Sequence, residues 1–257
     1  MFDGIPSEQY GLQIVNFDSG GVDDGSAGID VTIHNDWVYK KPKSYLYGTS
    51  KNTPLTFTMT ATAIDAQSGL DRRAIESWLL GHNTYKKLQI DQDDIANCYY
   101  NVIFTGASIK YVGNIMRGIV LSAECDAPWA WTFPKYLRYN FSGDQIKDFD
   151  FNFFNESDDN GYLYPITTFT LNSIGNSFQI TNYSDDNRIF LLEGLQPNET
   201  ITIDNCNKTI TSSTGLYRLD AFNKNWLRLK KGNNLMHLTS GIGTFTMECS
   251  FPRAIGG

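Results

Sequence analysis

The sequence predicts a mainly β protein with two domains and one α-helix. Three observations carry this prediction: apolar and polar residues alternate at a period of two in many segments, one segment alone shows helical spacing, and 257 residues suffice for two ordinary domains. A boundary is expected near Pro134–Gly143, before an acidic, Asn-rich stretch. We therefore expect an N-terminal domain over residues 1–137, a β-sandwich or split-barrel-like fold carrying the helix, and a C-terminal β-sandwich over residues 138–257.

Strand segments follow one another along the chain, separated by clusters of Gly, Asn and Asp. The clearest runs from Leu55 to Ala63, where apolar residues alternate with threonines, because successive side chains of a strand point to opposite faces. Two further long alternations span 119–125 and 245–251. The shorter runs are Gly11–Phe17, Asp30–His34, Tyr99–Phe104, Ser108–Val112, Ile166–Leu171, Arg188–Leu192, Thr200–Asp204 and Trp226–Leu229.

The helix is predicted between Ser68 and Leu80, where apolar residues recur at helical spacing. Ser68 with Asp71 three residues later resembles a capping box, and Gly81 is placed to end the helix. His82 follows the end of the helix, where an imidazolium suits the helix dipole, so we expect it to cap the last turn.

Charge and hydropathy exclude several classes of protein. The chain has 21 Lys and Arg against 28 Asp and Glu, for a net charge of −7, whereas partners such as nucleic acids and anionic lipids require basic surface. No run of 18 apolar residues predicts a membrane span, and the first residues do not resemble a secretory signal. We therefore expect neither specific nucleic-acid binding nor membrane insertion.

The four cysteines are far apart and form no CxxC pair. Cys125 and Cys249 each lie on the apolar side of an alternating segment. Without an export signal, we expect both to be buried free thiols and not disulfide partners.

Motifs for catalysis, metals and cofactors are absent from the sequence. None of the three histidines has a second ligand at zinc spacing, and no nucleophile elbow, Walker loop or dinucleotide fingerprint occurs. The acidic cluster at 91–94 fails the Ca²⁺-loop pattern, since Ala96 and Val102 stand where Gly and Glu are needed. We expect no catalytic residues, metal or cofactor. A glycosidase-type carboxylate pair stays an alternative, because it leaves no characteristic spacing.

Aromatic residues surround the basic stretch Lys40-Lys41-Pro42-Lys43. Three lysines are a weak electrostatic footprint for nucleic acid, so a hairpin tip or a protein contact is the favoured interpretation over base stacking. Trp226 is the candidate for binding at the surface of the C-terminal domain. The candidate contact residues of the aromatic stretch are His34, Trp37, Tyr39, Tyr45 and Tyr47.

Several short motifs occur in an order that points to one family. In the N-terminal half they are Phe2-Asp3-Gly4, Ser7-Glu8-Gln9-Tyr10-Gly11-Leu12, Ile75-Glu76-Ser77-Trp78-Leu79, Leu88-Gln89-Ile90-Asp91, Cys98-Tyr99-Tyr100 and Ala123-Glu124-Cys125-Asp126-Ala127-Pro128-Trp129. In the C-terminal half they are Gly194-Leu195, Glu199-Thr200-Ile201-Thr202-Ile203-Asp204 and Leu229-Lys230-Lys231-Gly232-Asn233-Asn234. This order resembles the distal tail proteins of bacteriophages with long, non-contractile tails, over most of the chain.

The resemblance implies a structural protein of the virion tail tip, assembled in the cytoplasm of the bacterial host. In this family the N-terminal domains form a hexameric ring that contacts the tail-tube protein above and the tail hub or tail-associated lysin below. The C-terminal domain is a galectin-like β-sandwich, which in some phages docks receptor-binding proteins. The ring lets DNA pass, and an acidic chain supplies repulsion suited to such a pore.

Under this interpretation the aromatic stretch between Ile33 and Tyr47 becomes the expected subunit interface, because its aromatic residues have no evident place in a core. The alternative is a carbohydrate-binding module acting in host-surface recognition, in which Trp226 would supply an aromatic face for a sugar.

Overall fold

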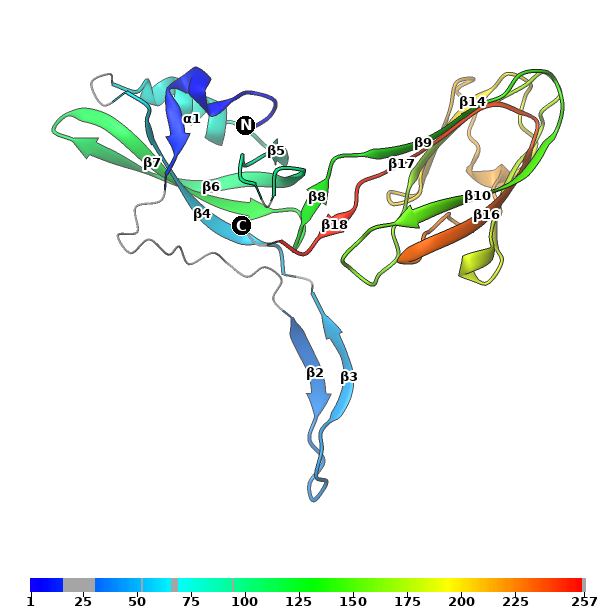
Figure 1. The fold of residues 1–257 in the computed structure, drawn as a ribbon, viewed down its shortest axis with the longest axis horizontal. Helices are drawn as coiled ribbons and strands as arrows, with labels where there is room; N and C mark the ends of the chain where they lie inside the picture. The colour runs from blue at the N-terminus through cyan, green and yellow to red at the C-terminus, as the bar shows by residue number, and fades with distance from the viewer. Residues whose placement is uncertain (16–30, 52, 66–68, 94, 256–257) are drawn as a thin grey trace. The chain divides into compact units, whose positions relative to one another are not determined.

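The computed structural model describes residues 1–15, 31–51, 53–65, 69–93 and 95–255. The predicted mainly β class is confirmed, with α1 as the α-helix of the described residues. The chain divides into two units (Figure 1): an N-terminal unit of Met1–Thr132 together with Arg253–Gly257, and a C-terminal unit of Phe133–Pro252. Each unit has its own hydrophobic core.

The N-terminal unit is built on one sheet, with a 3₁₀ turn, η1 (Ser7–Tyr10), before its first strand. A two-residue turn joins its two longest strands, and Gly113 there has a φ of 59°, which glycine adopts without steric cost. In sheet order the strands are β1 (Leu12–Ile14), β4 (Thr56–Ala63), β7 (Ile115–Cys125), β6 (Cys98–Val112), β8 (Ala130–Thr132) and β18 (Pro252–Arg253), with β5 (Lys86–Leu88) also paired to β6.

Helix α1 (Arg72–Leu80) buries its apolar residues in the core of the N-terminal unit. Its N-cap is Asp71, whose carboxylate accepts a hydrogen bond from the Ala74 N–H at 3.2 Å. The sequence predicted that the capping box begins at Ser68, whereas the N-cap of the observed helix is Asp71, three residues later. Ser68 itself lies outside the described residues. At the other end His82 Nε2 lies 2.7 Å from the Trp78 carbonyl oxygen, which confirms that His82 caps the last turn.

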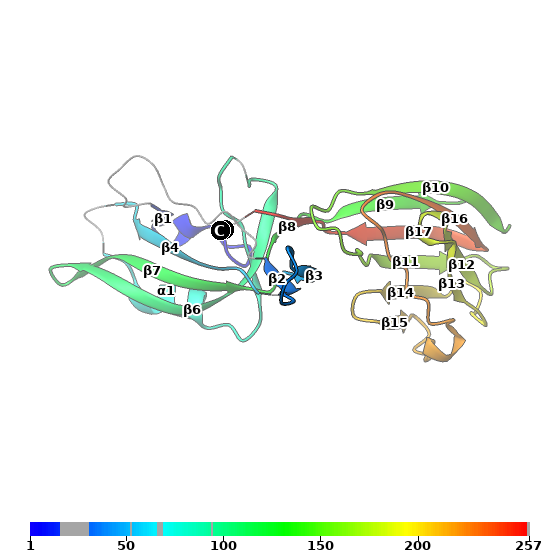
Figure 2. The same cartoon turned by 90° about the horizontal axis from the view of Figure 1, so that it is seen from below.

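The C-terminal unit is a sandwich of two antiparallel sheets (Figure 2). Two 3₁₀ turns, η2 (Tyr183–Asp185) and η3 (Leu219–Ala221), lie in its loops. One sheet has the order β10 (Lys147–Asn155), β16 (Gly232–Ser240), β12 (Phe178–Asn182) and β13 (Arg188–Leu192). The other has the order β15 (Thr209–Ser212), β14 (Thr200–Asp204), β11 (Ile166–Leu171), β17 (Ile242–Cys249) and β9 (Lys135–Asn140).

Aromatic residues fill the space between these two sheets. The rings of Phe169 and Phe178 stack with centroids 3.7 Å apart, and both are fully buried. Phe151 and Phe153 of β10 point into the same core. Alternation of inward apolar and outward polar residues is what a sandwich with two solvated outer faces requires.

Several strands match their predicted limits, and others correct the predictions. β11, β13 and β14 have the expected bounds. The runs 99–104 and 108–112 belong to the single strand β6, because a register shift between Phe104 and Gly106 interrupts its alternation. β1 is shorter than the predicted run, whose residues 16 and 17 lie outside the described ones. β9 lies within the predicted boundary region, so residues 135–137 fall in the C-terminal unit.

The predicted strand Trp226–Leu229 was wrong. Side chains satisfy its backbone in place of a neighbouring strand: Asn205 accepts from the Leu227 N–H, and Arg188 donates to the Trp226 carbonyl. Only Leu229 makes an isolated bridge, to Leu163. The period-two pattern was correct about burial but could not reveal where the backbone hydrogen bonds go.

The cysteine predictions hold. Cys98, Cys125, Cys206 and Cys249 are all free; Cys206 is exposed and the other three are buried. Burial raises the pKa of the Cys125 thiol to about 12, helped by the neighbouring Asp126 and Glu124. Burial also raises the pKa of Cys249. Both thiols are therefore unreactive core residues.

Two carboxylates inside the C-terminal unit are paired with arginines. Glu199 accepts from Arg218 Nε at 2.8 Å and Nη2 at 2.6 Å, and Asp185 accepts from Arg228 Nε at 2.8 Å. Burial raises the pKa of each carboxyl, but the hydrogen bonds and nearby positive charges outweigh burial and hold it below its usual range. These pairs fix loops against the sandwich.

Candidate subunit interface

Residues 31–51 form a two-stranded antiparallel hairpin, hereafter the aromatic hairpin (Figure 1). It consists of β2 (Thr32–Asp36) and β3 (Tyr45–Ser50), rich in the Thr, Ile and Tyr that favour strands. The register shifts between His34 and Asn35, where β3 contributes an extra residue. At the tip the Lys41 N–H donates to the Val38 carbonyl at 3.0 Å, and Lys40 takes a φ of 65°.

The aromatic hairpin exposes its large apolar side chains. The exposed fractions are 85% for Tyr39, 69% for Tyr47, 68% for Trp37 and 65% for Leu46. Every residue of β2 is exposed. Because an isolated two-stranded hairpin is only marginally stable in water, these side chains lack the burial that would normally hold such an element. A contiguous exposed apolar surface of this kind is typical of a protein contact.

Polar groups on the aromatic hairpin make local contacts. His34 Nε2 lies 2.9 Å from Ser50 Oγ across the two strands. The Lys40 ammonium lies 5.4 Å from the centre of the Tyr39 ring, within the range of a cation–π contact. The tip therefore combines apolar surface with positive charge.

The structure brings together five of the six candidate residues from the sequence. His34, Tyr45 and Tyr47 lie on the strands of the aromatic hairpin, and Trp37 and Tyr39 lie at its tip. Ile33, Val38 and Leu46 add exposed aliphatic surface to the same hairpin.

Trp226 lies in the C-terminal unit and is half-buried. Its ring meets Phe222 edge to face with centroids 4.7 Å apart, and it packs against the C-terminal core. Its carbonyl accepts from Arg188 Nε at 3.1 Å. These contacts give the Trp226 side chain a packing role.

The sequence did not reveal a polar cluster on the outer face of the four-stranded sheet. His237 Nδ1 lies 2.7 Å from Asp150 and its Nε2 lies 2.8 Å from Asp148, and both carboxylates are largely exposed. The register places Asp150 directly opposite His237, a pairing that could be found only once β10 and β16 were recognised as partners. Among the described residues no group of His, Cys, Asp or Glu has an arrangement that could hold a metal ion.

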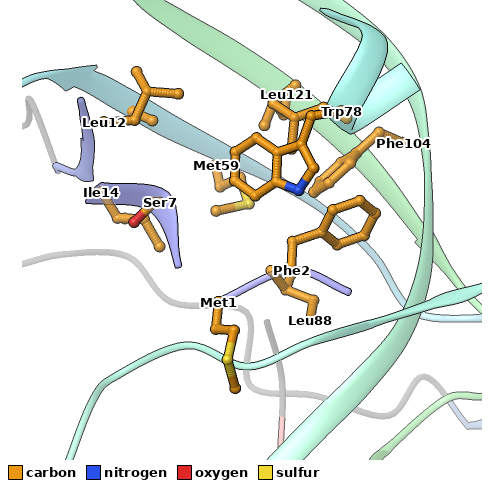
Figure 3. A pocket seen from close by; sticks show the side chains of 12 residues that line it. Met1, Phe2, Ser7, Leu12, Ile14, Met59, Trp78, Leu88, Phe104 and Leu121 are labelled. Atoms are coloured by element: carbon orange, nitrogen blue, oxygen red, sulfur yellow. The ribbon is translucent and has the colours of Figure 1, made fainter. Parts of the chain in front are cut away.

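A small apolar cavity of about 40 Å³ lies in the N-terminal unit (Figure 3). Phe2, Met59, Trp78 and Leu121 are among the side chains that surround it. The Trp78 indole N–H has no hydrogen-bond partner, and its ring stacks on Tyr10 at 4.4 Å. The side chains that line the cavity are apolar apart from the Ser7 hydroxyl and the Trp78 indole, and none of them is an acid or a base. A space this small and this apolar is typical of imperfect core packing.

Two family models together match nearly the whole chain. The model described as a phage tail protein N-terminal domain matches residues 1–127, and the model described as a phage tail C-terminal domain matches residues 129–250. One model falls on each of the two β units, and together they define a structural protein of the phage tail. The chain belongs to this family of phage tail proteins.

Solved structures of phage tail components share the fold. The Dit protein of phage SPP1, described as a paradigm of the hub adsorption apparatus in phages that infect Gram-positive bacteria, is 13% identical with a TM-score of 0.69, and 98% of each chain is covered. Chains of the phage P2 baseplate in its activated conformation match at 9% identity with a TM-score of 0.54 in Ca, and at 8% with 0.58 in Sr; each match covers 95% of this chain and 92% of the other.

These matches confirm the resemblance to distal tail proteins. No curated protein sequence matches the chain significantly. Within the described residues no helix has the length and hydropathy needed to cross a membrane.

Proposed function

We propose that this protein is a hub adaptor at the tip of a long, non-contractile phage tail, where six copies form a ring that joins the tail tube to the tail hub and the host-adsorption apparatus. The aromatic hairpin is the single observation that carries the proposal, because it presents a large apolar surface that needs a partner. The fold shared with the SPP1 Dit protein over both units supports the same role.

In this proposal the protein is an assembly component and not an enzyme. His34, Trp37, Tyr39, Tyr45 and Tyr47 lie in the contact between neighbouring subunits. The remaining partners are the tail-tube protein, the tail hub or tail-associated lysin and, in the host-adsorption apparatus, a receptor-binding protein. The ring lumen lets DNA pass, and a net charge of −7 per chain disfavours its retention.

The experiment compares Tyr39→Ala with Tyr217→Ala, a control in the C-terminal unit with a 70% exposed side chain. Wild-type protein should show six times the 29.0 kDa chain mass in light scattering. Tyr39→Ala should weaken association by about 30-fold, as expected for an interface aromatic worth about 2 kcal/mol. Its thermal stability as a monomer should be unchanged, because the ring is exposed.

Tyr217→Ala should retain the wild-type mass. A wild-type chain that stays monomeric at high concentration, without affinity for tail-tube or tail-hub protein, would refute the proposal. Equal effects of the two substitutions would show that the aromatic hairpin is not the interface.

A further inference from the structure

Asn160 and Gly161 form the only Asn–Gly pair of the sequence. They lie in a bend at residues 158–161, between β10 and β11, and both are exposed. In such a pair the main-chain nitrogen of the glycine can attack the side-chain amide carbon of the asparagine and close a five-membered succinimide ring. Glycine favours this attack because no Cβ shields its nitrogen.

A carboxylate lies where the attacking nitrogen must lose its proton. The Gly161 N–H donates to Asp159 Oδ2 at 2.9 Å, a distance at which a general base can act. A Cβ at Gly161 would lie 2.6 Å from the same oxygen, so a larger residue would displace the carboxylate from the N–H. The proton leaves in the plane of the amide, whereas the attacking lone pair is perpendicular to that plane. The hydrogen bond therefore does not obstruct the attack.

An ammonium group lies at the oxygen on which negative charge develops. Lys231 Nζ lies 3.3 Å from Asn160 Oδ1, and it donates to the Asp158 carbonyl at 3.0 Å, which holds it over the bend. Attack on the carboxamide carbon turns its oxygen into an oxyanion, and a positive charge already placed there lowers the barrier. The bend thus places a base at the nucleophile and a cation at the electrophile.

We propose that this bend converts its own Asn160 into an aspartyl residue. The Gly161 nitrogen bonds to Asn160 Cγ and gives its proton to Asp159. The carboxamide C–N bond then breaks, and its nitrogen leaves as ammonia with that proton. Water opens the succinimide at either carbonyl, which gives aspartate or isoaspartate. At neutral pH each conversion changes the net charge of the chain from −7 to −8 and adds a negative charge beside Lys231.

A second asparagine provides an internal comparison. The Ser173 N–H, which follows Asn172, also donates to a carboxylate, Asp144 Oδ1, at 3.2 Å. However, Asn172 is buried, its Nδ2 donates to the Gln145 carbonyl at 2.9 Å, and its Oδ1 accepts from the Ile174 N–H at 3.2 Å. Because main-chain partners hold both ends of its carboxamide, we expect Asn172 to remain unchanged while Asn160 reacts.

Peptide mapping of the full chain in heavy-oxygen water measures the conversion, because ring opening incorporates one oxygen atom from the solvent. At neutral pH the folded wild type should convert Asn160 about 10-fold faster than the same chain unfolded in urea, since only the fold holds the base and the cation in place. An Asn–Gly pair that reacts through its sequence alone would convert at the same rate or more slowly when folded. That result would overturn the proposal.

Two variants test the groups separately. Lys231→Met and Asp159→Ala should each slow the conversion in the folded protein by about 10-fold. The control Lys224→Met removes an exposed lysine of the same unit outside the bend and should leave the rate unchanged. Protection of the buried Cys249 from labelling verifies that each variant is folded. A wild-type rate in either variant contradicts the mechanism. The reaction needs no second copy, so its absence does not bear on the proposed ring.

Discussion

Replacing the buried Arg218 by Met should destabilise the C-terminal unit more than substitutions at its exposed positions. The Arg218 guanidinium donates two hydrogen bonds to Glu199, at 2.8 and 2.6 Å, and a third to the Gly194 carbonyl at 3.0 Å. The Glu199 side chain is fully buried, and its carboxylate also accepts from the Gln196 N–H. Arg218→Met retains an apolar stem of similar reach but leaves the carboxylate charge without its partner.

The size of the stability loss follows from the burial of the Glu199–Arg218 ion pair. Removing one partner of a buried, hydrogen-bonded ion pair costs about 3–5 kcal/mol, because the remaining charge stays desolvated. For a unit of this size such a loss lowers the melting temperature by about 12–20 °C. The double variant Glu199→Gln/Arg218→Met should recover more than half of the lost stability, because it buries no charge.

The stability lost in Arg218→Met should become smaller as the pH falls. In the wild type the pKa of Glu199 lies below its ordinary value of 4.5, so the pair stabilises the fold above that pH and the contribution is lost as pH falls through the folded pKa. In Arg218→Met burial is no longer outweighed and raises the pKa of Glu199. The variant should therefore be most destabilised near pH 7. The difference should begin to shrink above pH 4.5, as Glu199 of the variant takes up a proton, and shrink further below pH 4.5 as the wild type loses the contribution of its ion pair.

Thiol protection provides an assay that separates the two units. Cys249 is buried in the core of the C-terminal unit and Cys125 in that of the N-terminal unit, so peptide-level labelling during a urea titration reports each unfolding transition. Arg218→Met should shift only the Cys249 transition. The exposed Arg138, changed to Met, serves as control and should shift it by less than about 0.5 kcal/mol. A loss below about 1 kcal/mol at pH 7, or an equal loss at pH 7 and pH 4, would refute the reasoning.

Three further predictions use the same readouts. Gly241→Ala should lower the unfolding free energy of the C-terminal unit by about 1–3 kcal/mol, because the added Cβ would lie 2.7 Å from the Gly175 Cα. In the control Gly106→Ala the added Cβ meets nothing within 4 Å, so the N-terminal unit should lose less stability. Equal losses in the two unfolding transitions would contradict this prediction. Ala61→Val should stabilise the N-terminal unit by up to about 1 kcal/mol, because the larger side chain fills the cavity of about 40 Å³ and an empty cavity costs about 24 cal/mol per Å³. A lower urea midpoint for the labelling of Cys125 would show that the space is not available. Native protein at pH 7 should take up one maleimide per chain, at Cys206, and mass spectrometry that finds Cys125 labelled at a similar rate would disprove its burial.

The sequence by itself determined the class of the fold and much of its strand content. Period-two alternation located β4, β7, β11 and β17 because each buries one face only, and that condition is local to the strand. It failed for β10, where Phe149, Phe151 and Phe153 alternate with polar residues inside the acidic, Asn-rich stretch, in which no strand was predicted. A strand with an acidic outer face differs from a loop only through its partner β16, and pairing is not encoded locally.

For the candidate interface, the sequence identified the aromatic residues, and the tertiary structure showed which of them are exposed and which are packed against a core. An aromatic residue looks the same in a sequence whether a core covers it or water surrounds it, and only the fold shows that Tyr39 is exposed while Trp226 packs on Phe222. Charge is different, because a sum over residues does not depend on folding. The net charge of −7 and the lysines within residues 31–51 could therefore be read from the sequence, whereas the exposure of the apolar side chains beside those lysines is visible only in the fold.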